Sequence, residues 1–130
     1  MKVILVFLLF ILSFQANALD GNQLLEQCED TQKINDKKTG DFKSLNWMRA
    51  GRCMGIIEGL GSTHAYYGAM LDVLKLSDQA KEFYPCIPDK VTNYQQLLVL
   101  LNYLKKHPEE LHKNVTLIVH KALIDAFPCD

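Results

Sequence analysis

The most reactive side chains in this chain are four cysteines and four histidines, and their spacing limits the chemistry they could support. No Cys-x-x-Cys, Cys-x-x-His or His-Glu-x-x-His pair occurs, which argues against a zinc site. No serine lies in a Gly-x-Ser-x-Gly context, and solvated or structural roles suit the carboxylates Glu58 and Asp72 better than catalysis. We therefore expect no enzyme, no metal and no other cofactor, although four titratable imidazoles are present: His64, His107, His112 and His120.

An even number of cysteines is typical of disulfide bonds in an exported protein, and four cysteines allow three pairings. Cys28 and Cys53 lie about twelve residues before and after the polar stretch at Gly40, so helices of equal length that turn there would bring them level. Cys86 and Cys129 bracket a second pair of helical patterns in the same way. We therefore favour the pairs Cys28–Cys53 and Cys86–Cys129, each stabilising by roughly 3 to 4 kcal/mol in the chain-entropy model.

The N-terminus has the pattern of a secretory signal peptide. Lys2 precedes an apolar run over residues 3–12, and Ala16-Asn17-Ala18 is a small-x-small cleavage site. The apolar run is shorter than the ~20 residues that a membrane-spanning helix needs. We predict that residues 1–18 are cleaved and that residues 19–130 form one domain without a membrane anchor.

Charge gives no sign of a nucleic-acid partner. The chain has 14 basic and 15 acidic residues and a formal net charge of −1. The basic residues are scattered among acidic ones, whereas nucleic-acid-binding domains gather them on one face.

Periodicity predicts an all-α fold, a small disulfide-stabilised domain with about four main helices arranged as two helical hairpins. Asp20 is the expected N-cap of the first helix, and Ser44 that of a long second helix over about residues 45–74. The stretch from Ser77 to Tyr84 suggests one short helical turn.

The third helix should begin after Thr92, where Gln95 completes a capping box, and end at His107. Pro108 suits the first turn of a fourth helix that continues to residue 126.

Three glycines stand four residues apart on the second helix: Gly51, Gly55 and Gly59. Each interior glycine costs about 0.5 to 1 kcal/mol relative to alanine, so a stripe of them needs a packing reason. We favour close approach of another helix of the same chain, such as the first helix at Cys28. The alternative is a face for self-association.

A family resemblance rests mainly on the second half of the chain. It is carried by Cys86-Ile87-Pro88, Val91-Thr92, Gln95-Gln96-Leu97, Tyr103-Leu104, His107-Pro108-Glu109, Leu111-His112 and Ala126-Phe127-Pro128-Cys129. These segments resemble the Rap/Tai family of immunity proteins against type VI secretion amidase effectors. The resemblance implies a periplasmic, all-α, often dimeric protein that binds a peptidoglycan amidase and blocks its substrate groove, without being an enzyme itself.

The family's contact residues do not carry over, so the partner-binding segment has to be inferred from the chain itself. Glu82, Phe83 and Tyr84 follow the short helical turn, and loops commonly carry recognition. The alternative is that Phe83 and Tyr84 pack under the corner at Cys86.

The sequence is also compatible with two other functions. A periplasmic acid-stress chaperone of the HdeA type is also small, helical and exported, but its usual single disulfide contrasts with four cysteines here. A secreted hydrolase or lipid-binding helical protein is the other alternative. Client holding at acidic pH would identify the first, and turnover or an extracted lipid the second.

Overall fold

The computed structural model describes residues 19–36, 46–80 and 82–129. The predicted signal peptide, the turn at Gly40 and Ser44 lie outside these residues, and the signal peptide and the turn stay predictions. Among the helices described, none has the length and apolar character needed to cross a membrane.

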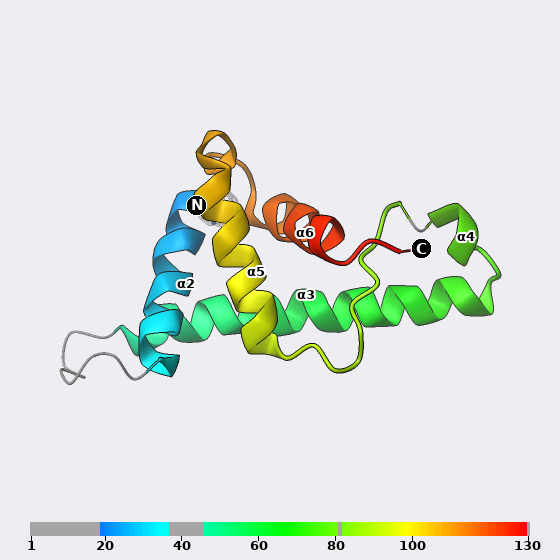
Figure 1. The fold of residues 1–130 in the computed structure, drawn as a ribbon, viewed down its shortest axis with the longest axis horizontal. Helices are drawn as coiled ribbons and strands as arrows, with labels where there is room; N and C mark the ends of the chain where they lie inside the picture. The colour runs from blue at the N-terminus through cyan, green and yellow to red at the C-terminus, as the bar shows by residue number, and fades with distance from the viewer. Residues whose placement is uncertain (1–18, 37–45, 81, 130) are drawn as a thin grey trace, which may run out of the picture.

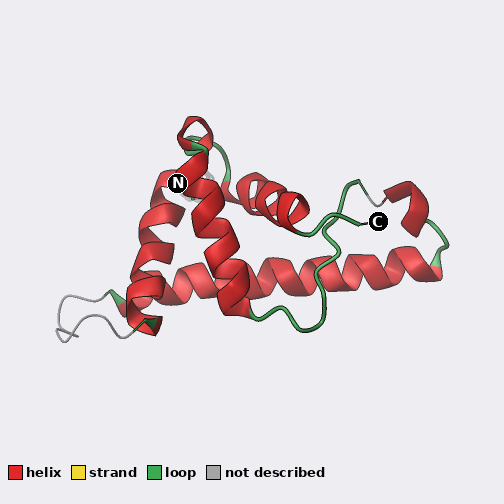
Figure 2. Cartoon of the chain, viewed as in Figure 1, coloured by secondary structure: helices red, strands yellow, loops and turns green. Residues whose placement is uncertain are grey.

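The described part of the chain is helical and contains no β-strand, which confirms the all-α prediction (Figure 2). The main helices are α2 (Gly21–Asn35), α3 (Trp47–Val73), α5 (Asn93–Lys106) and α6 (Val115–Ala126), with a short α4 (Ser77–Ala80) and a 3₁₀ helix η1 (Pro108–Glu110). Helix α3 runs along the whole molecule; α2 and α5 cross its first half, and α4 lies beside its end (Figure 1).

Local capping chemistry sets the starts of two helices as predicted. The Asp20 carboxylate accepts from the backbone N–H of Gln23 at 2.9 Å, and the Thr92 hydroxyl accepts from that of Gln95 at 3.2 Å. In both capping boxes the glutamine side-chain oxygen accepts a hydrogen bond from the backbone N–H of the cap residue. Backbone donors that the helix itself leaves free are satisfied in this way.

Two predicted helix starts are wrong. Helix α3 begins at Trp47, because the side chain of Asn46 accepts from the backbone N–H of Arg49 at 3.1 Å. The fourth helix does not run from Pro108: the chain makes only η1 there and turns before α6 starts at Val115. This start has a local cap, because the Asn114 side chain accepts from the backbone N–H of Thr116 at 2.9 Å. It also has a long-range contact, because the backbone N–H of Val115 donates to Leu19 O at 3.1 Å.

The hydrophobic core lies where α2, α5 and α6 meet the first half of α3. Helix α5 contributes one buried leucine stripe and α6 another apolar face against it. Burial of each such side chain contributes about 1.5–3 kcal/mol. The largest fully buried apolar side chains are Leu24, Ile57, Leu97, Leu100, Leu104, Ile118, Val119 and Leu123.

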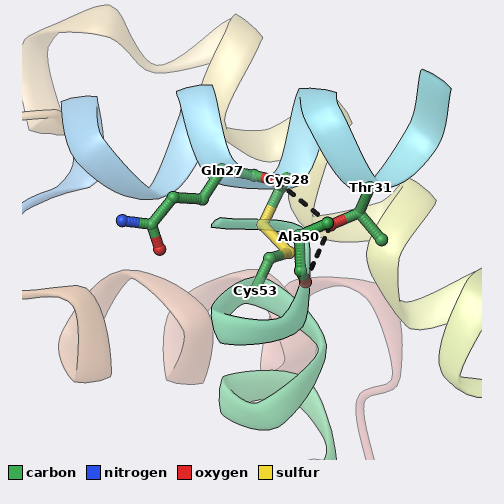
Figure 3. The surroundings of a disulfide bond; sticks show 5 residues. All are labelled: Gln27, Cys28, Thr31, Ala50 and Cys53. Carbon is green, nitrogen blue, oxygen red and sulfur yellow. Dashed lines mark hydrogen bonds between the residues drawn. A yellow bond between two sulfur atoms is a disulfide. The ribbon is translucent and has the colours of Figure 1, made fainter. Parts of the chain in front are cut away.

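Both predicted disulfides are present. Cys28–Cys53 joins α2 to α3 with a Cα–Cα distance of 5.2 Å, and both residues are 0% exposed. Beside it the Thr31 hydroxyl lies 3.1 Å from both Gln27 O and Ala50 O, so a hydrogen bond also crosses between the helices (Figure 3). Cys86–Cys129 closes a sequence separation of 43 residues at the surface, where Cys86 is exposed.

The glycine stripe of α3 does not pack against another helix, so the favoured interpretation of it was wrong. A Cβ added at Gly51, Gly55 or Gly59 would meet no atom within 4 Å. The stripe lies on an exposed face because α2 crosses α3 on the side that carries Cys53. Self-association therefore remains as the alternative explanation of the stripe.

A different glycine makes the close approach. A Cβ on Gly21 would lie 2.6 Å from Ile118 Cδ1 and 2.9 Å from the backbone of Leu111. The contact is close because the backbone N–H of Asn22 donates to Leu111 O at 3.1 Å. Gly21 thus lets the start of α2 dock on the turn between η1 and α6.

We expect Gly21→Ala to lower the free energy of unfolding by about 1–3 kcal/mol, because the added methyl group meets backbone that cannot move independently. Gly51→Ala is the matched control and should raise it by about 0.5–1 kcal/mol, since that site is open and helical. Urea unfolding followed by circular dichroism measures both. Equal effects of the two substitutions would contradict the assigned close approach.

Candidate functional site

The second half of α3 carries an exposed apolar stripe. Its members recur at helical spacings of three, four and seven residues, so they share one face. Large apolar side chains in water on one helix face are typical of protein-binding surfaces. The stripe consists of Tyr66, Tyr67, Met70, Val73 and Leu74, and Val73 is 82% exposed.

The segment after α4 extends the exposed surface at this end of the molecule. Phe83 is 70% exposed, which excludes the alternative that it packs under the Cys86 corner. Glu82 is exposed as well. Tyr84 is half-buried, and its ring lies 3.7 Å from where a Cβ on Gly68 would be, so it rests on α3.

A cleft of about 510 Å³ lies between α3, the start of α5 and the segment 84–91. The Cys86–Cys129 disulfide and a 2.8 Å bond from the backbone N–H of Cys86 to Phe127 O hold this segment in place. The lining consists of Glu58, Gly61, Ser62, His64, Ala65, Gly68, Tyr84, Pro85, Cys86, Ile87, Pro88, Asp89, Val91, Asn93 and Gln96.

One lining residue, His64, meets a second histidine that is far away in the sequence. His64 Nε2 of α3 lies 3.1 Å from His120 Nδ1 of α6, and the ring of His64 is buried. Burial, followed by the neighbouring His120, lowers the pKa of His64 below its ordinary value of 6.5. The lowered pKa favours a neutral His64 ring, whose Nε2 shares one hydrogen bond with His120 Nδ1.

The chain was compared with known families, and residues 20–129 match the model of the Rap1a immunity proteins. The chain belongs to the Rap1a immunity family. No curated protein and no solved structure matches it. Membership of the Rap1a family implies that the chain binds an effector protein, and it agrees with the resemblance found in the sequence.

In this Rap1a protein the predicted contact residues Glu82, Phe83 and Tyr84 lie together after α4. The four cysteines are structural, paired as predicted. Among the described residues no group of three or more His, Cys, Asp or Glu side chains is placed to hold a metal ion.

Sequence reasoning missed the α3 stripe and the residues of the cleft. The stripe looked like core because its spacing is that of any amphipathic helix, and spacing does not reveal which face is covered. The burial of Gln96 could have been predicted, because Gln96 precedes Leu100 and Leu104 at intervals of four on the buried face of α5. The contact between His64 and His120 could not be predicted from the sequence pattern, since 56 residues separate them.

The histidine pair predicts an acid-sensitive fold. Because the pKa of His64 is lower in the folded than in the unfolded protein, the unfolded state binds more protons as pH falls through about 6.5. The stability that the neutral, buried His64 ring contributes is intact at neutral pH, and it is lost as the solution is acidified toward the pKa of His64 in the folded protein. We expect the urea midpoint to fall from pH 7.5 to pH 5.5, and His64→Leu to flatten that dependence.

His112→Gln is the matched control, because it removes an exposed histidine that has no part in the pair. The two variants should be compared by how much the urea midpoint changes with pH, because a loss of packing at His64 lowers the midpoint at every pH and does not alter that change. An equal slope in His64→Leu and the parent protein would show that the pair is not the acid-sensitive element.

Proposed function

We propose that this Rap1a protein is exported to the periplasm and inhibits a peptidoglycan amidase effector of a type VI secretion system. Membership of the immunity family over residues 20–129 carries the proposal. Inhibition protects the producing cell, and it requires binding alone, so the protein needs no catalytic residues of its own.

Two features support export and removal of residues 1–18. The N-terminal pattern is that of a secretory signal peptide. Both disulfides suit an oxidising compartment, whereas structural disulfides are rare in the cytosol.

We infer that the effector binds at the end of α3 and α4. The exposed stripe offers aromatic and aliphatic side chains, which dominate the energy of protein interfaces, and Phe83 adds a further exposed ring nearby in the chain. Helices that lay an apolar face into a groove are a recurrent mode of recognition, which suits a partner with an open substrate groove.

A homodimer is a separate proposal, supported by the uncovered glycine stripe of α3. Analytical ultracentrifugation of the oxidised protein decides between monomer and dimer. A monomer at every concentration tested would remove this proposal and leave effector binding untouched.

The inhibition proposal is tested with the oxidised protein expressed from the full chain and the product of the adjacent gene. The two should co-purify as a stable complex, and cleavage of peptidoglycan by that product should stop in the complex. The absence of a complex, with cleavage unchanged, would overturn the proposal for that pair. Client holding at acidic pH would then become the next assay, because of the alternative acid-chaperone function.

A further inference from the structure

The cleft between α3, α5 and the segment 84–91 contains polar atoms that the fold does not satisfy. Gln96 is 6% exposed and its Oε1 atom has no hydrogen-bond partner. His64 is 9% exposed and its Nδ1 atom has none either. Buried polar atoms in native proteins are nearly always paired, so two of them lining one cleft call for an occupant.

The backbone of α3 comes close to Gln96 Oε1 at Gly61. A Cβ on Gly61 would come within 3.3 Å of this oxygen, tighter than an ordinary contact. Glu58, Gly61 and His64 stand three residues apart and so share the face of α3 that lines the cleft. Any larger residue at position 61 would therefore crowd the Gln96 amide between Glu58 and His64.

The electrostatic character of the cleft favours a cation. Its lining includes the carboxylates of Glu58 and Asp89, both exposed, and among the residues that the structure describes it includes no lysine or arginine. Asn93 Nδ2 donates to Glu58 Oε1 at 3.1 Å, which holds that carboxylate at the cleft. An anionic occupant would face two like charges, whereas a cationic one would gain charge-assisted hydrogen bonds.

We propose that this cleft receives an arginine side chain of the bound protein, an inference that rests on the proposed function. A guanidinium group carries five donors in one plane, so it can pair with the exposed Glu58 carboxylate. Once the two buried side chains shift toward the cleft, its other donors can pair with Gln96 Oε1 and His64 Nδ1. His64 Nδ1 accepts when Nε2–H donates to His120 Nδ1, so the occupant selects that tautomer of the pair.

The first test uses a small probe and needs no partner. The oxidised protein is titrated with N-acetylarginine methylamide, and the side-chain amide of Gln96 and the ring of His64 are followed by NMR. Saturable shifts of both groups are expected, together with at least tenfold weaker binding of the uncharged isostere N-acetylcitrulline methylamide. Equal binding of the two probes, or shifts confined to other residues, would overturn the proposal.

Two variants locate the binding at the cleft. Glu58→Gln changes an exposed carboxylate and should leave the fold intact, while Gln96→Leu removes the buried acceptor at similar volume. Each should weaken binding of the arginine probe about tenfold. Glu109→Gln, an exposed carboxylate outside the cleft lining, is the matched control and should bind as the parent protein does. No weakening in Glu58→Gln would contradict the assigned site.

The same variants separate this inference from the proposed function. If the parent protein inhibits the amidase and both variants bind it with unchanged affinity, the cleft inference fails and the immunity function stands. If the parent protein forms no complex with the amidase, the proposed function fails for that pair, and with it the assignment of the arginine to the effector. The probe titration then shows whether the cleft itself binds a guanidinium group.

Discussion

The double variant Cys28→Ala/Cys53→Ala is expected to lose about 4 kcal/mol of its free energy of unfolding. The bond closes a sequence separation of 25 residues, for which the chain-entropy model assigns roughly 3 to 4 kcal/mol. Both sulfur atoms also lie in the core, so their removal leaves a cavity between α2 and α3. Guanidinium unfolding followed by circular dichroism measures the loss, which is large against a typical total of about 5–15 kcal/mol.

The second disulfide supplies the comparison. Cys86→Ala/Cys129→Ala should cost a similar entropic amount, but it removes no atom from the buried cluster around Cys28. Under mild reduction of the native protein Cys86–Cys129 should open first, because Cys86 is exposed and Cys28 and Cys53 are not. Earlier reduction of Cys28–Cys53, detected by thiol labelling and mass spectrometry, would contradict the assigned burial.

The second large effect is expected on effector binding. Tyr66→Asp/Val73→Asp should weaken the complex at least about 100-fold, because two carboxylates would be buried in an apolar contact. Both side chains are exposed in the free protein, so its stability should change by no more than about 0.5 kcal/mol per substitution. Calorimetric or surface-binding titration against the amidase measures the affinity, and urea unfolding checks the stability.

Met48→Asp is the matched control for this prediction. Met48 is 79% exposed and lies on the same helix, 25 residues before Val73 and so roughly 37 Å away along α3 at ~1.5 Å per residue. It should bind the amidase as the parent protein does. Loss of binding in Met48→Asp with none in the stripe variant would place the interface at the other end of α3. Phe83→Asp asks separately whether the segment after α4 takes part.

Much of the local structure follows from short-range chemistry, and the sequence predicts it well. Asp20 with Gln23 and Thr92 with Gln95 form capping boxes because all the groups involved lie within one helical turn. Helix α5 ends at His107 because the residue before a proline is pushed out of helical geometry. The disulfide pairing also follows, since equal spacing from a turn limits which cysteines can meet.

Two of the wrong predictions involve contacts between distant segments, whereas the start of α3 was predicted wrongly although its Asn46 cap is local. The start of α6 combines the local Asn114 cap with a bond from Val115 to Leu19, and no local pattern contains the bond to Leu19. The glycine stripe of α3 was assigned to packing because spacing identifies a face but does not show what covers it. Gly21, which no periodic pattern marks, makes the close approach instead, against the turn at Leu111.

The amino-acid sequence by itself therefore determined the all-α class, the capping boxes of α2 and α5 and the cysteine pairs, and it pointed to the immunity family, because these depend on local chemistry and spacing. Only the tertiary structure decided which faces of α3 are bare and which residues line the cleft. His64, Gln96 and His120 come from three helices, and their meeting depends on how α5 and α6 cross α3. Packing over long sequence separations sets that crossing, so the surface with which the protein binds is a property of the assembled fold.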